Sequence, residues 1–378
     1  MATKTKVVLL YGGRSAEHEI SCRSAAYVLK NLPADQYDVV AVAIDHEGRW
    51  LPQDVAKLRQ QADKPLPILS QATMSAMPSL PAAEQNAGTA VTPLMLKGAV
   101  ENAPADADIV FFPVLHGSFG EDGKIQGLFE LAEVAYVGPD TLGSAIGMDK
   151  VVAKKLAQSA GVPVVPWLDF RAEVYFENPD HWHQRIQNEL GPTYFVKPVC
   201  LGSSIGITKV ESPSNLPMAL TEAFRYDEKV MVETALSVRE IECAVLGGYE
   251  PEVSLPGEIV AQKEFYDYEA KYLSADGALL KIPAELEPTQ VKEAQDLSRK
   301  VFKALELYGM ARVDLFLENS TGQFYLNEVN TIPGFTEISQ FPLLWQHSGM
   351  TGPQLIGKLI QLAQQRRDLT RRLSYKRD

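Results

Sequence analysis

The chain has 378 residues, of which 46% are hydrophobic and 22% are charged, and it carries a formal net charge of -12. This length excludes a single small domain, since domains hold roughly 150 residues, and it allows two or three domains with their own cores. No apolar run approaches the roughly 18 residues that span a bilayer, and the negative charge disfavours general nucleic-acid binding, so we predict neither a membrane nor a nucleic-acid partner.

The first part of the chain predicts strands that alternate with helices. Short apolar runs over residues 7–11, 37–44 and 109–114 indicate strands, and the segment 21–32 indicates a helix. Such alternation is typical of a parallel sheet covered by helices. Residues 60–104 are rich in Pro, Ala and Gln with weak periodicity, so we predict a peripheral insertion there.

The rest of the chain predicts a mixture of strands and helices, which gives an α/β fold that is α+β in parts. The expected helices cover residues 149–160, 288–307 and 353–369. The expected strands cover residues 194–197 and 230–233, part of 240–260, and both sides of a turn at 319–323. We expect domain boundaries near residues 140 and 235, which divide the chain into 1–140, 141–235 and 236–378.

The strongest chemical feature is a predicted strand pair in the last third of the chain. Arg312 and Asp314 stand on one strand, and Glu328 and Asn330 end the next. If Asp314 lies opposite Glu328, then Arg312 lies opposite Asn330 and all four side chains share one face of the sheet. The other face then holds the core side chains Val313, Leu315, Tyr325 and Val329.

Two carboxylates and an amide oxygen on one face form a hard-oxygen ligand set of the kind that Mg²⁺ uses together with substrate phosphates. The neighbouring guanidinium of Arg312 could stabilise negative charge that develops on a reacting acyl group. A solvated face held by a salt bridge is the alternative interpretation of an isolated strand pair.

Four other segments carry candidate residues. Lys197 precedes a loop at 202–206 whose glycines and hydroxyls could hold phosphate, although the spacing is not that of a Walker loop and a plain turn is the alternative. Glu17 follows the first strand and could bind a substrate ammonium, or it could complement a helix N-terminus. His116, in a glycine-rich stretch, could meet a carboxylate or be structural. The aromatic segment 265–272 could close over a site, or be an ordinary exposed loop.

Taken together and in order, these motifs resemble the D-alanine–D-alanine ligase family of the ATP-grasp superfamily. The resemblance runs from Gly12 to about Trp345 and rests on the segments GGRSAEHEIS, LHGSFGEDG, GMDK, VKP with GSSIGI, FYDYEAKYL, and ARVD with NEVNTIPGFTEIS. It implies a three-domain ATP-grasp architecture, with an N-terminal parallel-sheet domain that binds substrate and two α+β domains that sandwich ATP. It also implies an enzyme that joins two D-alanines to D-alanyl-D-alanine through a D-alanyl phosphate, releasing ADP and phosphate.

The resemblance also implies a role for individual residues. The positions that match catalytic residues of the family are Glu17, Ser203, Tyr272, Arg312, Gly334 and Ser339. Those that match substrate-binding residues are Glu17, His116, Arg312 and Ser339. Those that match ATP-binding residues are Lys150, Lys197, Ser203, Ser204, Glu233, Glu240 and Lys271. Those that match metal ligands are Asp314, Glu328 and Asn330.

Within these sets, the family's pattern implies that Arg312 and the Gly334 N–H stabilise an oxyanion, and that Ser339 binds the carboxylate of the second substrate. The expected cofactors are ATP and two Mg²⁺ or Mn²⁺ ions, and the expected assembly is a homodimer. Peptidoglycan precursor synthesis, and with it cell wall biogenesis and cell shape, is the implied process. The three cysteines, too few and too scattered for a disulfide framework, indicate the reducing cytoplasm.

Three alternatives stay open on the sequence. A depsipeptide ligase would use D-lactate as second substrate, and Tyr272 in the predicted closing loop favours D-alanine. Another carboxylate–amine ligase of the superfamily is disfavoured by Glu17 and Ser339. A non-catalytic ATP-binding relative would have lost part of the metal and oxyanion set, which is complete here. Glu337 departs from the family pattern in adding a negative charge near Ser339.

Overall fold

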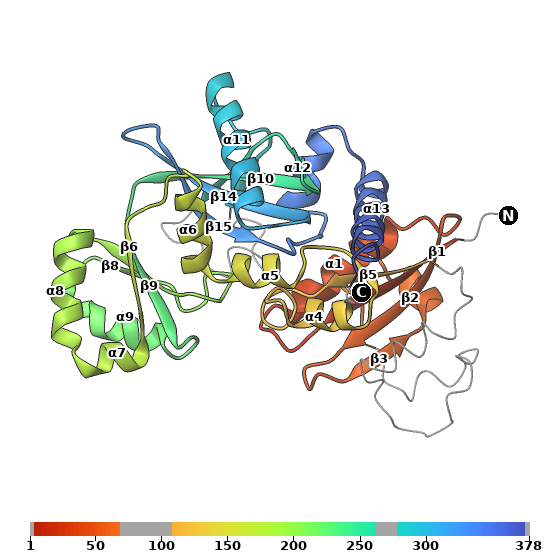
Figure 1. The fold of residues 1–378 in the computed structure, drawn as a ribbon, viewed down its shortest axis with the longest axis horizontal. Helices are drawn as coiled ribbons and strands as arrows, with labels where there is room; N and C mark the ends of the chain where they lie inside the picture. Colours follow the sequence, from red (N-terminus) through yellow and green to blue (C-terminus); the bar gives the residue numbers. More distant parts are fainter. Residues whose placement is uncertain (1–3, 69–107, 262–277, 375–378) are drawn as a thin grey trace.

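The structure is a computed structural model that describes residues 4–68, 108–261 and 278–374, and its described part is built on three sheets (Figure 1). The predicted insertion at 60–104 lies mostly outside these residues. Among the described helices, none is both long and apolar enough to cross a membrane.

The first sheet has the strand order β3-β2-β1-β4-β5, and all of its pairings are parallel except that of β3 with β2. Its strands are β1 (Thr5–Gly12), β2 (Tyr37–Ile44), β3 (Trp50–Gln53), β4 (Ile109–Val114) and β5 (Ala135–Tyr136). The helices of this region are α1 (His18–Lys30), α2 (Val55–Gln60), α4 (Lys124–Leu131) and α5 (Thr141–Met148). The predicted parallel sheet is confirmed, and β2 and β4 have the predicted bounds.

The second sheet is antiparallel, with the strand order β6-β9-β7-β8. Its strands are β6 (Trp167–Arg171), β7 (Tyr194–Pro198), β8 (Thr208–Val210) and β9 (Lys229–Thr234). The helical segments around it are α6 (Lys150–Ser159), α7 (Ala172–Glu177), α8 (Pro179–Leu190), the short turn η2 (Pro213–Asn215) and α9 (Leu216–Ala223). Helix α6 begins where predicted because the Asp149 carboxylate accepts hydrogen bonds from the first free backbone N–H groups.

The third sheet is also antiparallel and has the order β13-β12-β10-β14-β15, with β11 beside β10. Its strands are β10 (Val238–Gly247), β11 (Glu252–Val253), β12 (Gly257–Ala261), β13 (Ala278–Lys281), β14 (Gly309–Glu318) and β15 (Phe324–Asn330). The last helices are α11 (Pro288–Ala304), α12 (Gln340–His347) and α13 (Gly352–Thr370). Helices α11 and α13 confirm the two helices predicted in this part of the chain.

The C-terminal helix α13 returns to the first sheet, where Figure 1 draws it beside the N-terminal strands. Leu359 and Ile360 of α13 belong to the same buried cluster as Val7 of β1 and Phe112 of β4. The Arg366 guanidinium lies 4.0 Å from the Tyr136 ring centre. Burial of these apolar side chains therefore stabilises the packing of α13 against the N-terminal sheet.

Strands β14 and β15 pair in the predicted register around Arg312, Asp314, Glu328 and Asn330, whose shared side of the sheet we call the functional face. Asp314 lies opposite Glu328, and Arg312 lies opposite Asn330. A bulge follows, because Leu315 pairs with Leu326 and leaves Asn327 as an extra residue. The extra residue reverses the side-chain alternation beyond it. The assignment of Tyr325 to the core is therefore wrong: Tyr325 lies opposite Phe316 on the functional face, and Leu326 takes the core position.

Candidate active site

The functional face of the third sheet gathers Arg312, Asp314, Glu328 and Asn330 as predicted. The Arg312 guanidinium donates from Nε and Nη2 to the two Asp314 carboxylate oxygens, each at 2.7 Å. The Asn330 amide donates to the same carboxylate at 2.9 Å. Asp314 is buried, so this carboxylate is held by neighbours on both strands rather than by water.

Two charged residues from other strands and helices complete this face. Lys150, at the start of α6, places its Nζ 3.0 Å from Glu328 Oε2. Glu242 on β10 lies directly opposite Asp314, and its Oε2 is 2.9 Å from Arg312 Nε. The sequence analysis missed Glu242, although an acidic residue inside the otherwise apolar run 241–246 is a signal that could have found it. Arg312 is thus oriented by two carboxylates.

A buried charge cluster lies between α6 and the second sheet. Glu233 is 1% exposed, and its two carboxylate oxygens meet Lys154 Nζ at 2.6 Å and Lys197 Nζ at 2.7 Å. Burial works against ionisation of Glu233, but the two ammonium groups outweigh it and hold its pKa below the ordinary value of 4.5. Lys154, one helical turn after Lys150, is a further residue that the sequence analysis missed.

The second and third sheets meet at Lys197. Its Nζ lies 5.8 Å from the ring centres of both Phe195 on β7 and Phe316 on β14. Glu240 on β10 lies opposite Phe316 and therefore on the functional face. The structure thus brings Lys197, Glu233 and Glu240, three of the predicted ATP-binding residues, to the junction of the two sheets.

The loop at 202–206 reaches across to the N-terminal region. Ser203 and Ser204 both have left-handed backbone angles, with φ of 55° and 58°, which is uncommon for residues other than glycine. The Ser203 hydroxyl donates to the Glu17 carboxylate. Glu17 makes no side-chain cap for α1, although it precedes that helix, so its carboxylate faces Ser203 and the glycines at 117 and 202. The interpretation of this loop as a plain turn does not account for that contact.

His116 follows β4 and is buried between α1 and the segment after β15. Its Nε2 lies 2.9 Å from Ser24 Oγ, and its Nδ1 lies 2.9 Å from the Ile332 carbonyl oxygen. Burial opposes protonation, but the Glu121 carboxylate, 3.8 Å away, together with Glu17 and the Ile332 carbonyl, outweighs it and raises the pKa of His116. The histidine therefore links three segments, and the charge of Glu17, the carboxylate that Ser203 contacts, is among those that act on it.

Gly334 and Ser339 lie next to each other in the segment after β15. A Cβ on Gly334 would come within 2.8 Å of Ser339 Oγ, so only glycine fits without displacement. Ser339 Oγ accepts a hydrogen bond from the Thr336 N–H at 3.0 Å and lies 2.7 Å from the Thr336 hydroxyl. The two predicted closing-loop residues, Lys271 and Tyr272, lie outside the described residues.

The residues present fit a divalent cation and a nucleotide. Asp314, Glu328 and Asn330 offer hard oxygen atoms from two paired strands, which is the donor chemistry that Mg²⁺ prefers. In the protein alone, Arg312 and Lys150 neutralise those carboxylates. Such a cluster of opposite charges is suited to exchange its internal ion pairs for contacts with an anionic ligand and its metal ions.

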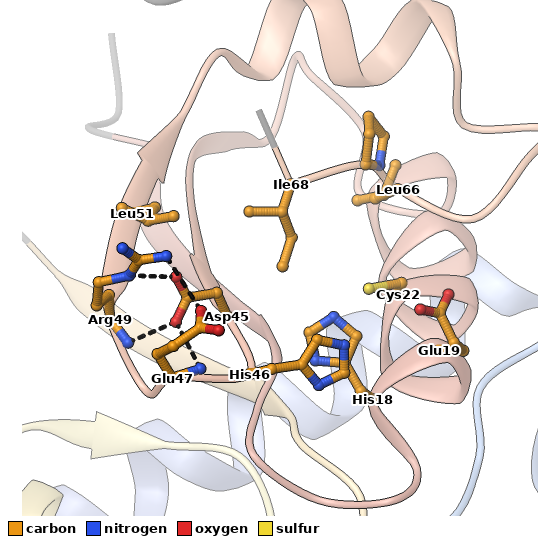
Figure 2. A pocket seen from close by; sticks show the side chains of 11 residues that line it. His18, Glu19, Cys22, Asp45, His46, Glu47, Arg49, Leu51, Leu66 and Ile68 are labelled. Atoms are coloured by element: carbon orange, nitrogen blue, oxygen red, sulfur yellow. Dashed lines mark hydrogen bonds and ion pairs between the residues drawn. The ribbon is translucent and has the colours of Figure 1, made fainter. Parts of the chain in front are cut away.

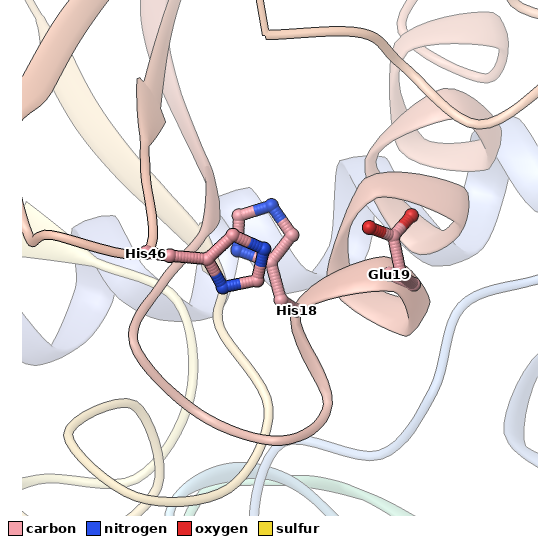
Figure 3. Close-up of side chains that lie close together, drawn as sticks. All are labelled: His18, Glu19 and His46. Atoms are coloured by element: carbon pink, nitrogen blue, oxygen red, sulfur yellow. The ribbon is translucent and has the colours of Figure 1, made fainter.

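A separate pocket lies between α1 and the end of β2 (Figure 2). His18 and His46 stack in it with ring centres 3.9 Å apart and planes inclined by 25°, and Glu19 lies close by (Figure 3). Ring nitrogens coordinate a metal in the plane of the ring, so nearly parallel rings do not converge on one ion. Burial, with the charge of Glu19, raises the pKa of Cys22 to about 12, so this neighbouring thiol is protonated at neutral pH. We assign no metal to this group.

Comparison with known proteins identifies the family. The models for the D-ala D-ala ligase N-terminus and C-terminus match residues 6–139 and 156–361. The D-alanine--D-alanine ligase A of Bradyrhizobium diazoefficiens is 45% identical over 96% of each chain, and the D-alanine--D-alanine ligase of Acetivibrio thermocellus is 42% identical over 97% of each.

Solved structures agree with this result. The D-alanine-D-alanine ligase of Coxiella burnetii is similar with a TM-score of 0.76 and 32% identity, covering 97% of each chain. The VanG D-Ala:D-Ser ligase of Enterococcus faecalis has a TM-score of 0.77 and 33% identity, covering 96% of this chain and 100% of its own. These neighbours share the ATP-grasp architecture that the motifs implied. The chain therefore belongs to the D-alanine–D-alanine ligase family.

Proposed function

We propose that this chain joins two D-alanine molecules into D-alanyl-D-alanine, with cleavage of one ATP to ADP and phosphate. The observation that carries the proposal is the functional face of β14 and β15, where Arg312 and three metal-type ligands converge beside Lys150. Phosphoryl transfer needs little from a protein except positioning and charge stabilisation, and both are available there.

The proposed metal and nucleotide ligands are the charged and polar residues of the functional face and of the junction between the second and third sheets. Asp314, Glu328 and Asn330 would hold Mg²⁺ or Mn²⁺, with two ions expected, and bound metal would neutralise charge on the transferring phosphoryl group. The phosphates and the nucleoside would be bound by Lys150, Lys197, Ser203, Ser204, Glu233, Glu240 and Lys271. The convergence of Lys197 with two aromatic rings supports this assignment, because a cation attracts phosphate oxygens and flat rings can stack on a nucleotide base.

The first chemical step is phosphorylation of one D-alanine. Glu17 would bind its ammonium group, and the hydroxyl of Ser203 would keep the Glu17 carboxylate in place. One carboxylate oxygen of D-alanine then attacks the γ-phosphorus of ATP, the bond to the bridging oxygen breaks, and ADP leaves. The product is a D-alanyl phosphate, whose acyl carbon is activated.

The second step joins the amino acids. The amine of the second D-alanine attacks the acyl carbon and loses a proton, and phosphate leaves with the former carboxylate oxygen. Arg312 and the Gly334 N–H would stabilise the negative charge on the acyl oxygen. Ser339, next to Gly334, would bind the carboxylate of the second substrate, and Tyr272 would help to exclude water that could hydrolyse the acyl phosphate.

The wider setting of the reaction is part of the same proposal. The dipeptide would serve peptidoglycan precursor synthesis, and thus cell wall biogenesis and cell shape. We assign the enzyme to the cytoplasm, where ATP is available and the three cysteines, none of which forms a disulfide among the described residues, remain reduced. We also propose a homodimer and three domains over residues 1–140, 141–235 and 236–378, a division supported by the strand composition of the three sheets.

The test is release of ADP and identification of the product by mass spectrometry. Reactions would contain ATP and Mg²⁺ with D-alanine alone, with D-alanine and D-lactate, or with D-alanine and D-serine. We expect ADP release with D-alanine alone and the dipeptide of D-alanine as main product in all three mixtures. Absence of ADP release that depends on D-alanine would overturn the proposal, and a dominant mixed product would reassign the second substrate.

A further inference from the structure

Ser24 is a fully buried serine of α1 that lies seven positions after Glu17, on the side of the helix that faces β4 and the segment after β15. Its hydroxyl oxygen accepts a hydrogen bond from the Phe335 N–H at 3.1 Å and lies 2.9 Å from His116 Nε2. His116 and Phe335 are also buried, so water does not compete for either hydrogen bond. The hydroxyl therefore joins α1 to two segments far away in the sequence.

The contacts of His116 fix the direction of these hydrogen bonds. A carbonyl oxygen only accepts, so Nδ1 carries the hydrogen that is donated to Ile332 O at 2.9 Å. In the neutral ring, Nε2 then accepts from the Ser24 hydroxyl, whose oxygen still accepts from the Phe335 N–H. In the protonated ring, Nε2 donates to the Ser24 oxygen instead, and all three segments stay connected.

The two anchored backbone groups lie on either side of Gly334. Ile332 is held through its carbonyl by His116, and Phe335 is held through its N–H by Ser24. Pro333 has no N–H to donate. Among described residues, the Gly334 N–H has no backbone or side-chain acceptor. The Gly334 N–H is therefore available to a ligand. Because glycine has a flexible backbone, the direction of this N–H depends on the hydrogen bonds that hold Ile332 and Phe335.

A second buried serine on the same helix offers a comparison. Ser21 Oγ accepts from the Gly12 N–H at 2.7 Å and donates to the Val114 carbonyl, so it ties α1 to the strands beneath it. Among the residues that the structure describes, Ser24 has no hydrogen bond to a strand of this sheet, and its backbone partner belongs to the segment that carries Gly334. Helix α1 can thus be docked on its sheet by one serine, while the other acts on the reaction site.

We propose that Ser24 is a positioning residue that, with His116, holds the Gly334 N–H toward the acyl oxygen during attack of the second amine. This rests on the proposed function. Because the acyl oxygen gains negative charge in that attack and not in the preceding phosphoryl transfer, loss of Ser24 selectively slows dipeptide formation. A merely structural serine would slow both steps together, or neither.

The test separates the two steps in a rapid chemical quench experiment. ADP formed in the first turnover measures phosphoryl transfer, and dipeptide formed measures amine attack. The main variant is Ser24→Ala, and Ser24→Cys is a second one that keeps the size of the side chain but weakens its hydrogen bonds. Ser298→Ala is the matched control, because Ser298 is also a fully buried helical serine that hydrogen-bonds a backbone carbonyl, in α11, away from the site.

For Ser24→Ala we expect amine attack to slow at least tenfold, ADP formation to change less than threefold, and the KM for ATP to change less than twofold. Ser24→Cys should fall between this variant and the wild type, and Ser298→Ala should match the wild type in both steps. Equal slowing of both steps, or no slowing of either, would overturn the proposal. If Ser24→Ala does not fold, Ser24→Cys is judged by the same comparison of the two steps. Amine attack at the wild-type rate in Ser24→Cys would then overturn the proposal.

Measurements on the wild-type enzyme distinguish a failure of this proposal from a failure of the proposed function. If it releases no ADP with D-alanine, the proposed function has failed. If it releases ADP and forms dipeptide, but the Ser24 variants do so with unaltered step rates, only the role of Ser24 has failed.

Discussion

Lys154 offers the sharpest test of how the nucleotide end of the site is held. Its side chain is 1% exposed, and its ammonium group lies 2.6 Å from Glu233 Oε1 and donates to the Leu326 carbonyl oxygen at 2.7 Å. Substitution Lys154→Met keeps most of the apolar volume and removes the charge. Glu233 then keeps Lys197 as its remaining ammonium partner, on the other carboxylate oxygen.

The size of the effect follows from burial. Removing one partner of a buried ion pair costs about 3–5 kcal/mol, because the remaining charge is left without compensation. Lys197 still compensates part of the Glu233 charge, so we expect about 3 kcal/mol, the lower end of that range. For a chain of this length, with a urea m-value of about 3 kcal/mol/M or more, this lowers the urea midpoint by about 1 M or slightly less.

The assay is urea unfolding followed by far-ultraviolet circular dichroism, with the KM for ATP measured in parallel. Lys155→Met is the matched control, because Lys155 is the next residue of the same helix and pairs with Asp169 at 3.2 Å, but its side chain is 57% exposed. Exposed pairs contribute about 0–1 kcal/mol, so the control should unfold near the wild-type midpoint. The KM for ATP should rise only in Lys154→Met, since Glu233 is then misplaced.

The pH dependence provides an independent check. The pKa of Glu233 is lowered in the folded protein, so its contribution to stability is present above the ordinary value of 4.5 and is lost as the pH falls through the folded value. Loss of Lys154 raises that folded pKa, so the variant should lose this contribution at a higher pH than the wild type. A midpoint for Lys154→Met no lower than that of Lys155→Met would refute the reasoning.

Three further substitutions test the rest of the site. Gly334→Ala puts a Cβ 2.8 Å from Ser339 Oγ and should lower kcat about 100-fold, the effect of losing an oxyanion donor; a kcat within threefold of wild type would contradict this. Glu242→Gln removes the charge that orients Arg312 from β10 and should lower kcat about tenfold, whereas an unaltered kcat would leave that orientation to Asp314 alone. Tyr272→Phe should raise the ratio of D-alanyl-D-lactate to dipeptide, and an unchanged product ratio would show that Tyr272 does not set specificity.

The sequence predicted best where periodicity and chemistry coincide. The polar positions of β14 and β15 alternate with apolar ones near Asp314 and Glu328, which predicts the face that each side chain takes, and the assumed pairing of Asp314 with Glu328 is the one that the structure has. Beyond them, the bulge at Asn327 moved Tyr325 to the opposite face. A bulge is determined by the packing of neighbouring strands, and the sequence of β15 carries no local signal for it.

Other features depend on contacts between distant segments. Lys154 looks like a surface charge in the sequence, and only the three-dimensional structure reveals that it is buried against an opposite charge. Ser24 looks like one of several small residues in a helix until Phe335 is brought beside it. Short strands such as β3 and β6 were missed because a few residues carry little periodicity.

The docking of α13 on the N-terminal sheet illustrates the same limit at the level of whole elements. The helix itself was predicted from its apolar spacing, but its partner surface is formed by β4 and β5, more than 200 residues earlier in the chain. Apolar stripes indicate that a helix is buried, and they do not identify the surface that buries it.

The central claim is that D-alanine is activated as an acyl phosphate and then joined to a second D-alanine. The most direct measurement uses D-alanine with isotopically labelled carboxylate oxygens, together with ATP and Mg²⁺, and analyses the released phosphate by mass spectrometry. One labelled oxygen should appear in phosphate for each dipeptide formed, because the attacking carboxylate oxygen leaves with the phosphoryl group. Dipeptide formation with unlabelled phosphate would contradict the mechanism, and phosphate release without dipeptide would contradict the proposed activity.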